Sequence, residues 1–187
     1  MGRELRFRGV PISGTIWSVN ALLIVPDVVR EIHQDYIAAG ADIITTNTYG
    51  LIRRDLAKAG IEDQFAELNA LACSLAREAR NAVDHQVLIA RSLPPLGGGS
   101  LRPDLMAPLE EIAPFYQEHA ELLAPNVDIL LCETMFSAGE ARAAADSACK
   151  TGKPVWVSWT LHEDHSGRFR TGFLFRVRFG SRTRQYF

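Results

Sequence analysis

Several features that would place this chain in a particular class are missing from its sequence. It has no run of 18 or more apolar residues, so no membrane-spanning helix is expected. Its three cysteines, Cys73, Cys132 and Cys149, are too few and too scattered for a disulfide framework, which favours a cytoplasmic location. The basic amino-terminal segment lacks the apolar stretch of a secretion signal. What remains is an ordinary globular composition, 47% hydrophobic and 22% charged, in 187 residues that suit one domain.

Two common kinds of ligand site are also missing from the sequence. No Gly-x-Gly-x-x-Gly follows a predicted strand, which argues against dinucleotide binding. The glycines at 97–99 lack the lysine of a phosphate-binding loop. No cysteines are paired at metal-ligand spacing, and the cluster His162–His165 consists of adjacent loop residues, which rarely converge on one ion. We therefore interpret 162–165 as a polar loop.

Short apolar runs without polar alternation predict strands that are covered on both faces, as in a parallel sheet. The predicted strands are Asp42–Thr46, Val87–Ala90, Val127–Cys132 and Pro154–Thr160. Amphipathic patterns that precede them predict helices after Pro26, over Ile61–Val83, over Ala107–Ala124 with a break at Pro114, and from the Ser137–Glu140 capping box to Gly152. This helix–strand alternation predicts an α/β fold, either an open doubly wound sheet or part of a closed barrel.

The predicted strands end in polar residues, at the edge where α/β proteins place their sites. Thr45–Tyr49 follow the first strand and Ser92 the second, although turn chemistry alone also explains such residues. Strand alternation turns Glu133 into the barrel or crevice at its mouth, and Cys132 toward the helices. A carboxylate there needs water or a cation, which could be a ligand amino group or a neighbouring arginine.

The cysteines are interpreted mainly as structural. Cys73 and Cys149 fall in predicted helices, where we expect small core residues. Cys132 could be a thiol nucleophile, but its predicted orientation toward the helices argues against this role.

Four ordered segments make the sequence resemble the homocysteine S-methyltransferase family over roughly residues 1–172. These segments are Ala39–Tyr49, Ser92–Gly98, Val127–Met135 and Gly152–Thr160, and Met1–Leu5 with Ile16–Trp17 are similar to the family's opening. The resemblance implies a (β/α)8 barrel of about 300 residues, of which this chain would form the amino-terminal portion with about four to five parallel strands.

The resemblance also implies a reaction, the transfer of a methyl group from a sulfonium-type donor, S-methylmethionine or S-adenosylmethionine, to homocysteine, giving methionine. In the family a zinc ion turns the homocysteine thiol into a thiolate. By this resemblance Thr46 helps hold the substrate carboxylate and Glu133 its amino group. Trp17 lies near the donor pocket, where its ring attracts a positive centre. Asn47 and Thr48 line the pocket.

This sequence departs from the family in several places. The family's zinc ligands are a cysteine after the sixth strand and an adjacent pair near the eighth, and neither has a counterpart here. We therefore expect this chain to bind no zinc. The family's Asp-Gly-Gly before the first Met-Gly has no counterpart either. Arg91 replaces a usual glycine, which predicts crowding at the strand end.

The last residues form a basic segment without resemblance to the family. Residues 165–187 hold six arginines and no acid, whereas residues 1–164 hold 14 basic and 22 acidic residues. We therefore divide the chain into a partial barrel domain, 1–172, and a divergent tail, 173–187.

Three hypotheses follow from the sequence. The first is a family enzyme that acts on homocysteine and a methyl donor, without a membrane or nucleic-acid partner. The second is a truncated, catalytically inactive barrel fragment. The third and weakest is nucleic-acid binding through the arginines of the tail. The sequence leaves the oligomeric state open.

Overall fold

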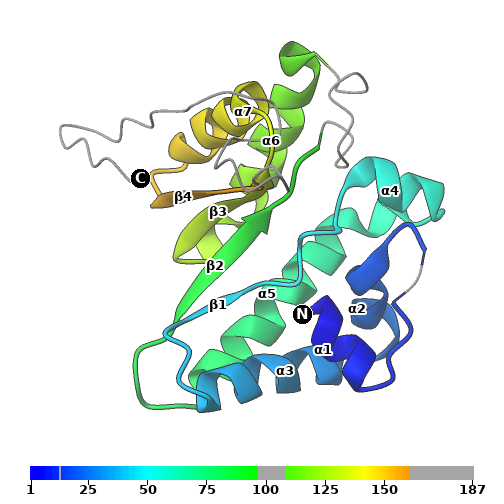
Figure 1. Cartoon of the computed structure of the whole chain (residues 1–187), viewed down its shortest axis with the longest axis vertical. Coiled ribbons are helices and arrows are strands. Elements are labelled where there is room, and N and C mark those ends of the chain that lie inside the picture. The colour runs from blue at the N-terminus through cyan, green and yellow to red at the C-terminus, as the bar shows by residue number, and fades with distance from the viewer. Residues whose placement is uncertain (13, 97–107, 161–187) are drawn as a thin grey trace.

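The core of the protein is a parallel four-stranded sheet (Figure 1). The computed structural model describes residues 1–12, 14–96 and 108–160. Each strand pairs in parallel with the next along the chain. The strands, in the order of the sheet, are β1 (Ile43–Thr45), β2 (Leu88–Leu93), β3 (Ile129–Met135) and β4 (Val155–Trp159). The predicted parallel α/β fold is therefore confirmed.

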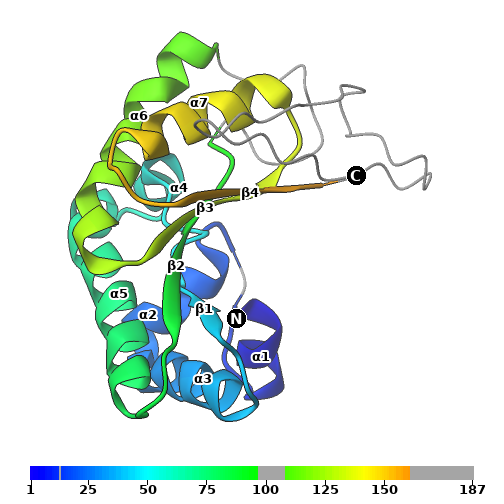
Figure 2. The ribbon, with the colours of Figure 1, turned by 90° about the vertical axis from the view of Figure 1, so that its left-hand side faces the viewer.

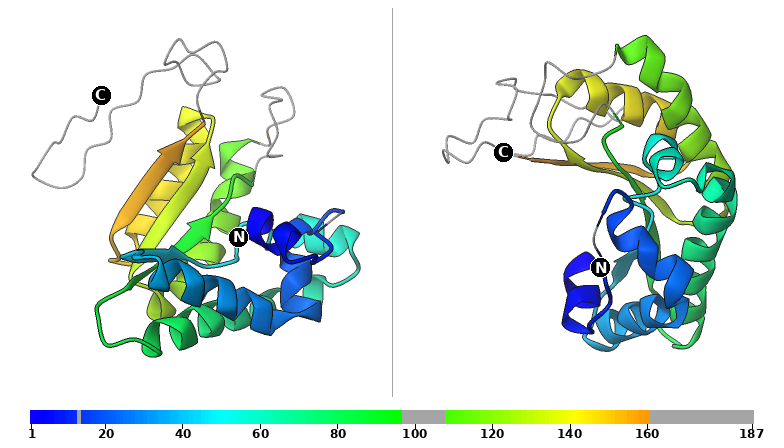
Figure 3. Two further views of the ribbon diagram at one scale, coloured as in Figure 1. Left: turned by 60° about the horizontal axis from the view of Figure 1, so that its bottom comes forward. Right: turned by 90° about the vertical axis from the view of Figure 1, so that its right-hand side faces the viewer.

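The main helices lie along the outside of the curved sheet, so that the elements form an open arc (Figures 2 and 3). They are α3 (Pro26–Ala38), α5 (Phe65–Asn81), α6 (Leu109–Leu123) and α7 (Ala138–Cys149). The shorter elements are α1 (Gly2–Phe7), η1 (Trp17–Val19), α2 (Asn20–Ile24), α4 (Arg53–Lys58), η2 (Glu62–Gln64) and η4 (Ala124–Asn126). None of the helices in these described ranges is long and apolar enough to cross a membrane.

Two apolar clusters hold the arc together. The larger lies between the sheet and helices α5, α6 and α7, and includes Ile89, Leu130 and Tyr116. The smaller joins α1, α2, α3 and α5 around residues such as Leu22 and Phe65. Burial of apolar area in these two clusters is the main favourable contribution to folding.

Two sequence-based predictions about the helices are wrong. Pro114 does not divide its helix, because α6 runs unbroken from Leu109 to Leu123 with the proline inside it. The face formed by Ile112, Tyr116 and Ala120 is buried, and its packing offsets the backbone hydrogen bond that proline cannot make. Cys149 is exposed rather than part of the core. It follows Ala148, the last buried residue of α7, and so points about 100° away from the buried face.

The predicted capping box at the start of α7 forms only in part. The Ser137 hydroxyl accepts the Glu140 backbone N–H at 3.4 Å, as predicted. The Glu140 carboxylate is fully buried, and it accepts the Leu96 backbone N–H (2.7 Å) and the Tyr116 hydroxyl (2.8 Å). Since Leu96 follows β2, Glu140 links α7 and α6 to the chain that leaves this strand.

A buried histidine makes the stability of the fold depend on pH. His33 of α3 is 3% exposed, and burial lowers its pKa from 6.5 to about 4. The unfolded chain takes up a proton below pH 6.5, whereas the folded chain does so only near pH 4. The free energy of unfolding should therefore fall by up to about 3 kcal/mol between these two pH values.

Urea unfolding at pH 7, 6, 5 and 4.5 measures this dependence. In His33→Gln the fall should be smaller, although His119, whose pKa burial also lowers, leaves a residual slope. An unchanged slope in this variant would contradict the assignment.

Candidate functional site

The carboxyl ends of the four parallel strands meet at one edge of the sheet, and polar side chains gather there. They come from the segment after β1, from the ends of β2 and β3, and from the residue after β4. These residues are Thr46, Asn47, Thr48, Tyr49, Ser92, Glu133 and Thr160. The prediction that the polar strand ends come together is therefore confirmed.

Glu133 is the only carboxylate among these strand-end residues. Leu130 and Cys132 are fully buried in the cluster under the helices, whereas Leu131 and Glu133 are half-buried on the other face of β3. The Ser92 hydroxyl donates to Glu133 Oε2 at 2.5 Å. In the part of the chain that the structure describes, no lysine or arginine forms an ion pair with Glu133. The carboxylate thus faces the concave side of the sheet and accepts a hydrogen bond from a hydroxyl group.

The backbone next to Glu133 is strained. Thr134 has φ 61°, a left-handed conformation that a β-branched residue rarely adopts, and the pairing of β3 with β4 shifts between Cys132 and Met135. The Ser158 hydroxyl lies 2.9 Å from the Thr134 backbone N–H and accepts its hydrogen bond. Such a conformation costs on the order of 1–3 kcal/mol and is often found at functional sites. Here the irregularity lies directly after Glu133 in β3.

The hydroxyls after β1 form a buried chain of hydrogen bonds. Thr48 Oγ1 donates to the Ser92 backbone oxygen at 3.0 Å and lies 2.9 Å from Thr46 Oγ1. Because the single proton of Thr48 is used by Ser92, Thr46 is the donor between the two threonines. For Thr46 to donate to a ligand instead, its hydroxyl must turn away from Thr48, while Thr48 keeps its hydrogen bond to the Ser92 oxygen.

Asn47 connects the site to the amino-terminal elements. Its Nδ2 donates to the Ser18 backbone oxygen, and its Oδ1 accepts the Ser18 hydroxyl, both at 2.9 Å. These bonds hold η1, which begins with Trp17. Thr46, Asn47 and Thr48 are 3%, 2% and 0% exposed, and their polar groups bond within the protein. That these three residues contact a substrate stays a prediction.

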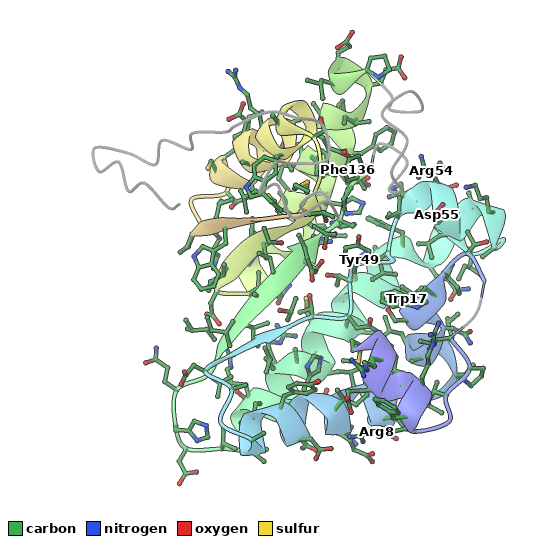
Figure 4. The ribbon with its side chains drawn as sticks, viewed as in Figure 1. Arg8, Trp17, Tyr49, Arg54, Asp55 and Phe136 are labelled. Atoms are coloured by element: carbon green, nitrogen blue, oxygen red, sulfur yellow. The ribbon has the colours of Figure 1, made fainter. Side chains whose placement is uncertain are left out.

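Trp17 lies beside Tyr49 and is 40% exposed (Figure 4). The two rings meet edge to face, with centroids 6.3 Å apart. The backbone of Trp17 has φ 41°, and a Cβ on Gly2 would lie 2.4 Å from its Cζ2. Gly2 is therefore required where α1 contacts the indole ring. The structure therefore places a partly exposed indole ring beside Tyr49, which lies in the segment after β1.

Sequence reasoning did not assign a role to Tyr49. Burial raises the pKa of its hydroxyl, the Thr134 side chain lowers it, and the charge of Glu133 adds to the increase. The neutral phenol therefore borders the carboxylate. Its position directly after Asn47 and Thr48 could have marked Tyr49 as a site residue. Tyrosine is also common in strands, however, so the position alone did not distinguish the two explanations.

Arg91 points away from the strand ends instead of crowding them, contrary to the prediction. It is fully buried between β2 and the helices, where it donates to the His119 backbone oxygen and, at 3.0 Å, to Asn69 Oδ1. Burial lowers the pKa of its guanidinium to about 10. The guanidinium therefore stays charged at neutral pH, and the groups that accept its hydrogen bonds, a backbone carbonyl and an amide oxygen, carry no charge.

The described residues do not fit a zinc site. No three His, Cys, Asp or Glu side chains come together within 1–12, 14–96 and 108–160. The three cysteines lie on α5, β3 and α7, and burial raises the pKa of Cys132 to about 12, which disfavours the thiolate that binds metals. These residues therefore give no basis for a metal-dependent step.

A curved parallel sheet with helices outside and polar side chains at its strand ends is the arrangement of a barrel-type α/β protein, a class whose sites lie at the carboxyl ends of the strands. The family model for homocysteine S-methyltransferase matches residues 1–176. The chain belongs to this family.

Relatives with curated names show how much of the family fold is present. The homocysteine S-methyltransferase of Escherichia coli is 32% identical over 178 residues, which cover 87% of this chain and 57% of that protein. Homocysteine S-methyltransferase YbgG of Bacillus subtilis is 30% identical, over 76% of this chain and 50% of that protein. The chain thus spans little more than half the length of these relatives.

A solved structure agrees with these sequence comparisons. The metallated form of the homocysteine methyltransferase MmuM from Escherichia coli matches with a TM-score of 0.81 and 30% identity. The match covers 92% of this chain and 64% of that one.

Proposed function

We propose that this chain binds homocysteine as the amino-acid-binding part of a homocysteine S-methyltransferase. Glu133 carries the proposal, because its carboxylate is half-buried, faces the concave side of the sheet and has no cationic partner among the described residues. A substrate ammonium group would supply the missing positive charge.

The carboxylate of the substrate is assigned to Thr46. To donate to it, Thr46 must turn its proton away from Thr48, so binding exchanges the Thr46–Thr48 hydrogen bond for one to the ligand. Ser92 accepts from Thr48 through its backbone oxygen and donates to Glu133 through its hydroxyl, so it connects the residues assigned to the two ends of the amino-acid group. The role of Asn47 is to hold η1 and with it Trp17.

The reaction proposed for the complete fold is methyl transfer from a sulfonium-type donor, S-methylmethionine or S-adenosylmethionine, to give methionine. The homocysteine thiol loses its proton, its sulfur forms a bond to the methyl carbon, and the sulfonium C–S bond breaks to release a neutral thioether. The exposed ring of Trp17 suits the cationic donor, because the face of an indole attracts positive charge.

A second candidate is a chain that binds homocysteine but transfers no methyl group by itself. It is favoured by the chemistry of the described residues, among which no three His, Cys, Asp or Glu side chains come together to hold a metal ion. The tail 173–187, which raised the possibility of nucleic-acid binding, lies outside the described residues, and no observation favours that role.

A methyl-transfer assay with zinc analysis separates the two candidates. We expect the purified chain to hold no stoichiometric zinc and to form no methionine from homocysteine and S-methylmethionine, with zinc added or chelated. Zinc-dependent methionine formation would exclude the second candidate. Absence of both turnover and homocysteine binding would contradict the proposed function itself.

A further inference from the structure

At the shifted pairing between β3 and β4, two residues of β3 lie opposite one residue of β4. The pairing is regular up to Cys132 and resumes at Met135, so that Glu133 and Thr134 together face Ser158. This is a β-bulge, an irregularity that is rare between parallel strands and is often found next to active sites, where it changes the direction of a side chain. Because Glu133 is the first residue of the bulge, the irregularity can affect where its carboxylate lies.

The bulge changes which residues of β3 face the helices. In a regular strand successive side chains alternate between the two faces of the sheet. Met135 would then share the concave face with Glu133, and Thr134 would be buried under the helices. Instead Met135 is fully buried in the same core cluster as Cys132, whereas Thr134 is exposed. Glu133 and Thr134 therefore both lie outside this core, next to each other at the carboxyl end of β3.

Three hydroxyl groups contact Thr134, whose φ is 61°. The Ser158 hydroxyl accepts its backbone N–H at 2.9 Å, and the Thr160 hydroxyl donates to its backbone oxygen at 3.4 Å. The side chain of Thr134 is hydrogen-bonded to the phenol of Tyr49. A β-branched residue keeps such a conformation only where its surroundings impose it. The bond to Ser158 is the shorter of the two backbone contacts, and it comes from the residue directly opposite the bulge.

Ser158 lies on the same face of the sheet as Glu133. Val157 and Trp159 pack against the core under the helices, so Ser158 between them lies on the concave side. On the other side of β3, the Ser92 hydroxyl of β2 donates to the Glu133 carboxylate at 2.5 Å. The neighbouring strands thus contact this part of β3 from both sides, β2 at the carboxylate and β4 at the backbone of the next residue.

We propose that Ser158 is a positioning residue that orients Glu133 toward the amino group of the substrate. Its hydroxyl holds the backbone of Thr134, and this backbone sets the direction of the carboxylate that precedes it. The inference rests on the proposed function, in which Glu133 binds the ammonium group of homocysteine. Ser158 does not touch the substrate in this arrangement, but it determines how well the site distinguishes homocysteine from a ligand that lacks the amino group.

Isothermal titration calorimetry of the whole chain with homocysteine and with 4-mercaptobutyrate, which lacks the amino group, tests this role. Ser158→Ala should weaken homocysteine binding about 3- to 10-fold, the effect of one hydrogen bond, and 4-mercaptobutyrate binding less than about 2-fold. A merely structural role would weaken the binding of both compounds equally. Ser74→Ala is the matched control, because it removes a hydroxyl that donates to Glu78 on α5 at 3.0 Å and should leave both affinities unchanged.

Ser158→Thr and Ser158→Val separate the hydroxyl from the shape of the side chain. Threonine and valine are both β-branched and favoured in strands, so both variants should fold even if Ser158→Ala does not. Threonine keeps the hydroxyl and should keep the preference for homocysteine, whereas valine should reduce it about 3- to 10-fold. Equal preferences in these two variants would overturn the role of Ser158.

Thr134→Gly tests whether Ser158 acts through the bulge, since glycine adopts a positive φ without strain. In the Thr134→Gly background, Ser158→Ala should change the preference less than about 2-fold, because the bulge no longer depends on the hydroxyl. An equal loss with and without Thr134→Gly would contradict the proposed route. If the unmodified chain shows no preference for homocysteine, the proposed function fails and this role with it. If it shows the preference and Ser158→Val keeps it, only the role of Ser158 fails.

Discussion

Replacing Glu133 by glutamine should weaken homocysteine binding on the order of 10- to 100-fold, the value of one charge-assisted hydrogen bond. The side chain keeps its size and can still contact Ser92, but the negative charge that faces the concave side of β3 is lost. The substrate ammonium would then be desolvated without a counter-charge. Isothermal titration calorimetry measures the change in dissociation constant directly.

Glu121→Gln is the matched control for this change. Glu121 lies on α6, is exposed and contacts Gln117 at 2.8 Å, so its loss should leave homocysteine binding unchanged. If Glu133→Gln binds as tightly as the unmodified chain, Glu133 does not hold the amino group.

Replacing Arg91 by alanine should lower the free energy of unfolding by about 3–5 kcal/mol. The guanidinium is fully buried, so its removal leaves a large cavity beneath β2. It also leaves the His119 oxygen and Asn69 Oδ1 without the donors that link β2 to α6 and α5. Urea unfolding at pH 7 gives the free energy.

Arg91→Met separates volume from charge. Methionine fills most of the space and removes the cost of burying a positive charge, so we expect it to lose less than half as much stability as alanine. A loss below about 1 kcal/mol in Arg91→Ala would show that the arginine does not hold the layers together.

The hydrophobic patterns of the sequence predicted the strands and main helices, because these patterns depend directly on which side chains are buried. Val127–Cys132 is mostly apolar, in keeping with the burial of one face of β3 under the helices, and the facing of Cys132 follows from the two-residue period of a strand. The convergence of Thr46, Ser92 and Glu133 was predictable for a related reason, because parallel strands end at the same edge.

Contacts between distant residues were beyond these patterns. The residues around Asn47 give no indication that it bonds to Ser18. The same is true of Glu140, whose carboxylate accepts the backbone N–H of Leu96. The direction of Arg91 depends on how α5 and α6 pack, and the left-handed Thr134 depends on the shifted pairing with β4. Each of these features is set by tertiary packing, which overrides what the residue type alone favours.

The most direct test of the account is a calorimetric titration of homocysteine into the whole chain, beside its analogue that lacks the amino group, 4-mercaptobutyrate. The account predicts saturable binding of one homocysteine per chain and binding of the analogue weaker by at least about 10-fold. Equal binding of the two compounds, or no saturable binding of homocysteine, would contradict it.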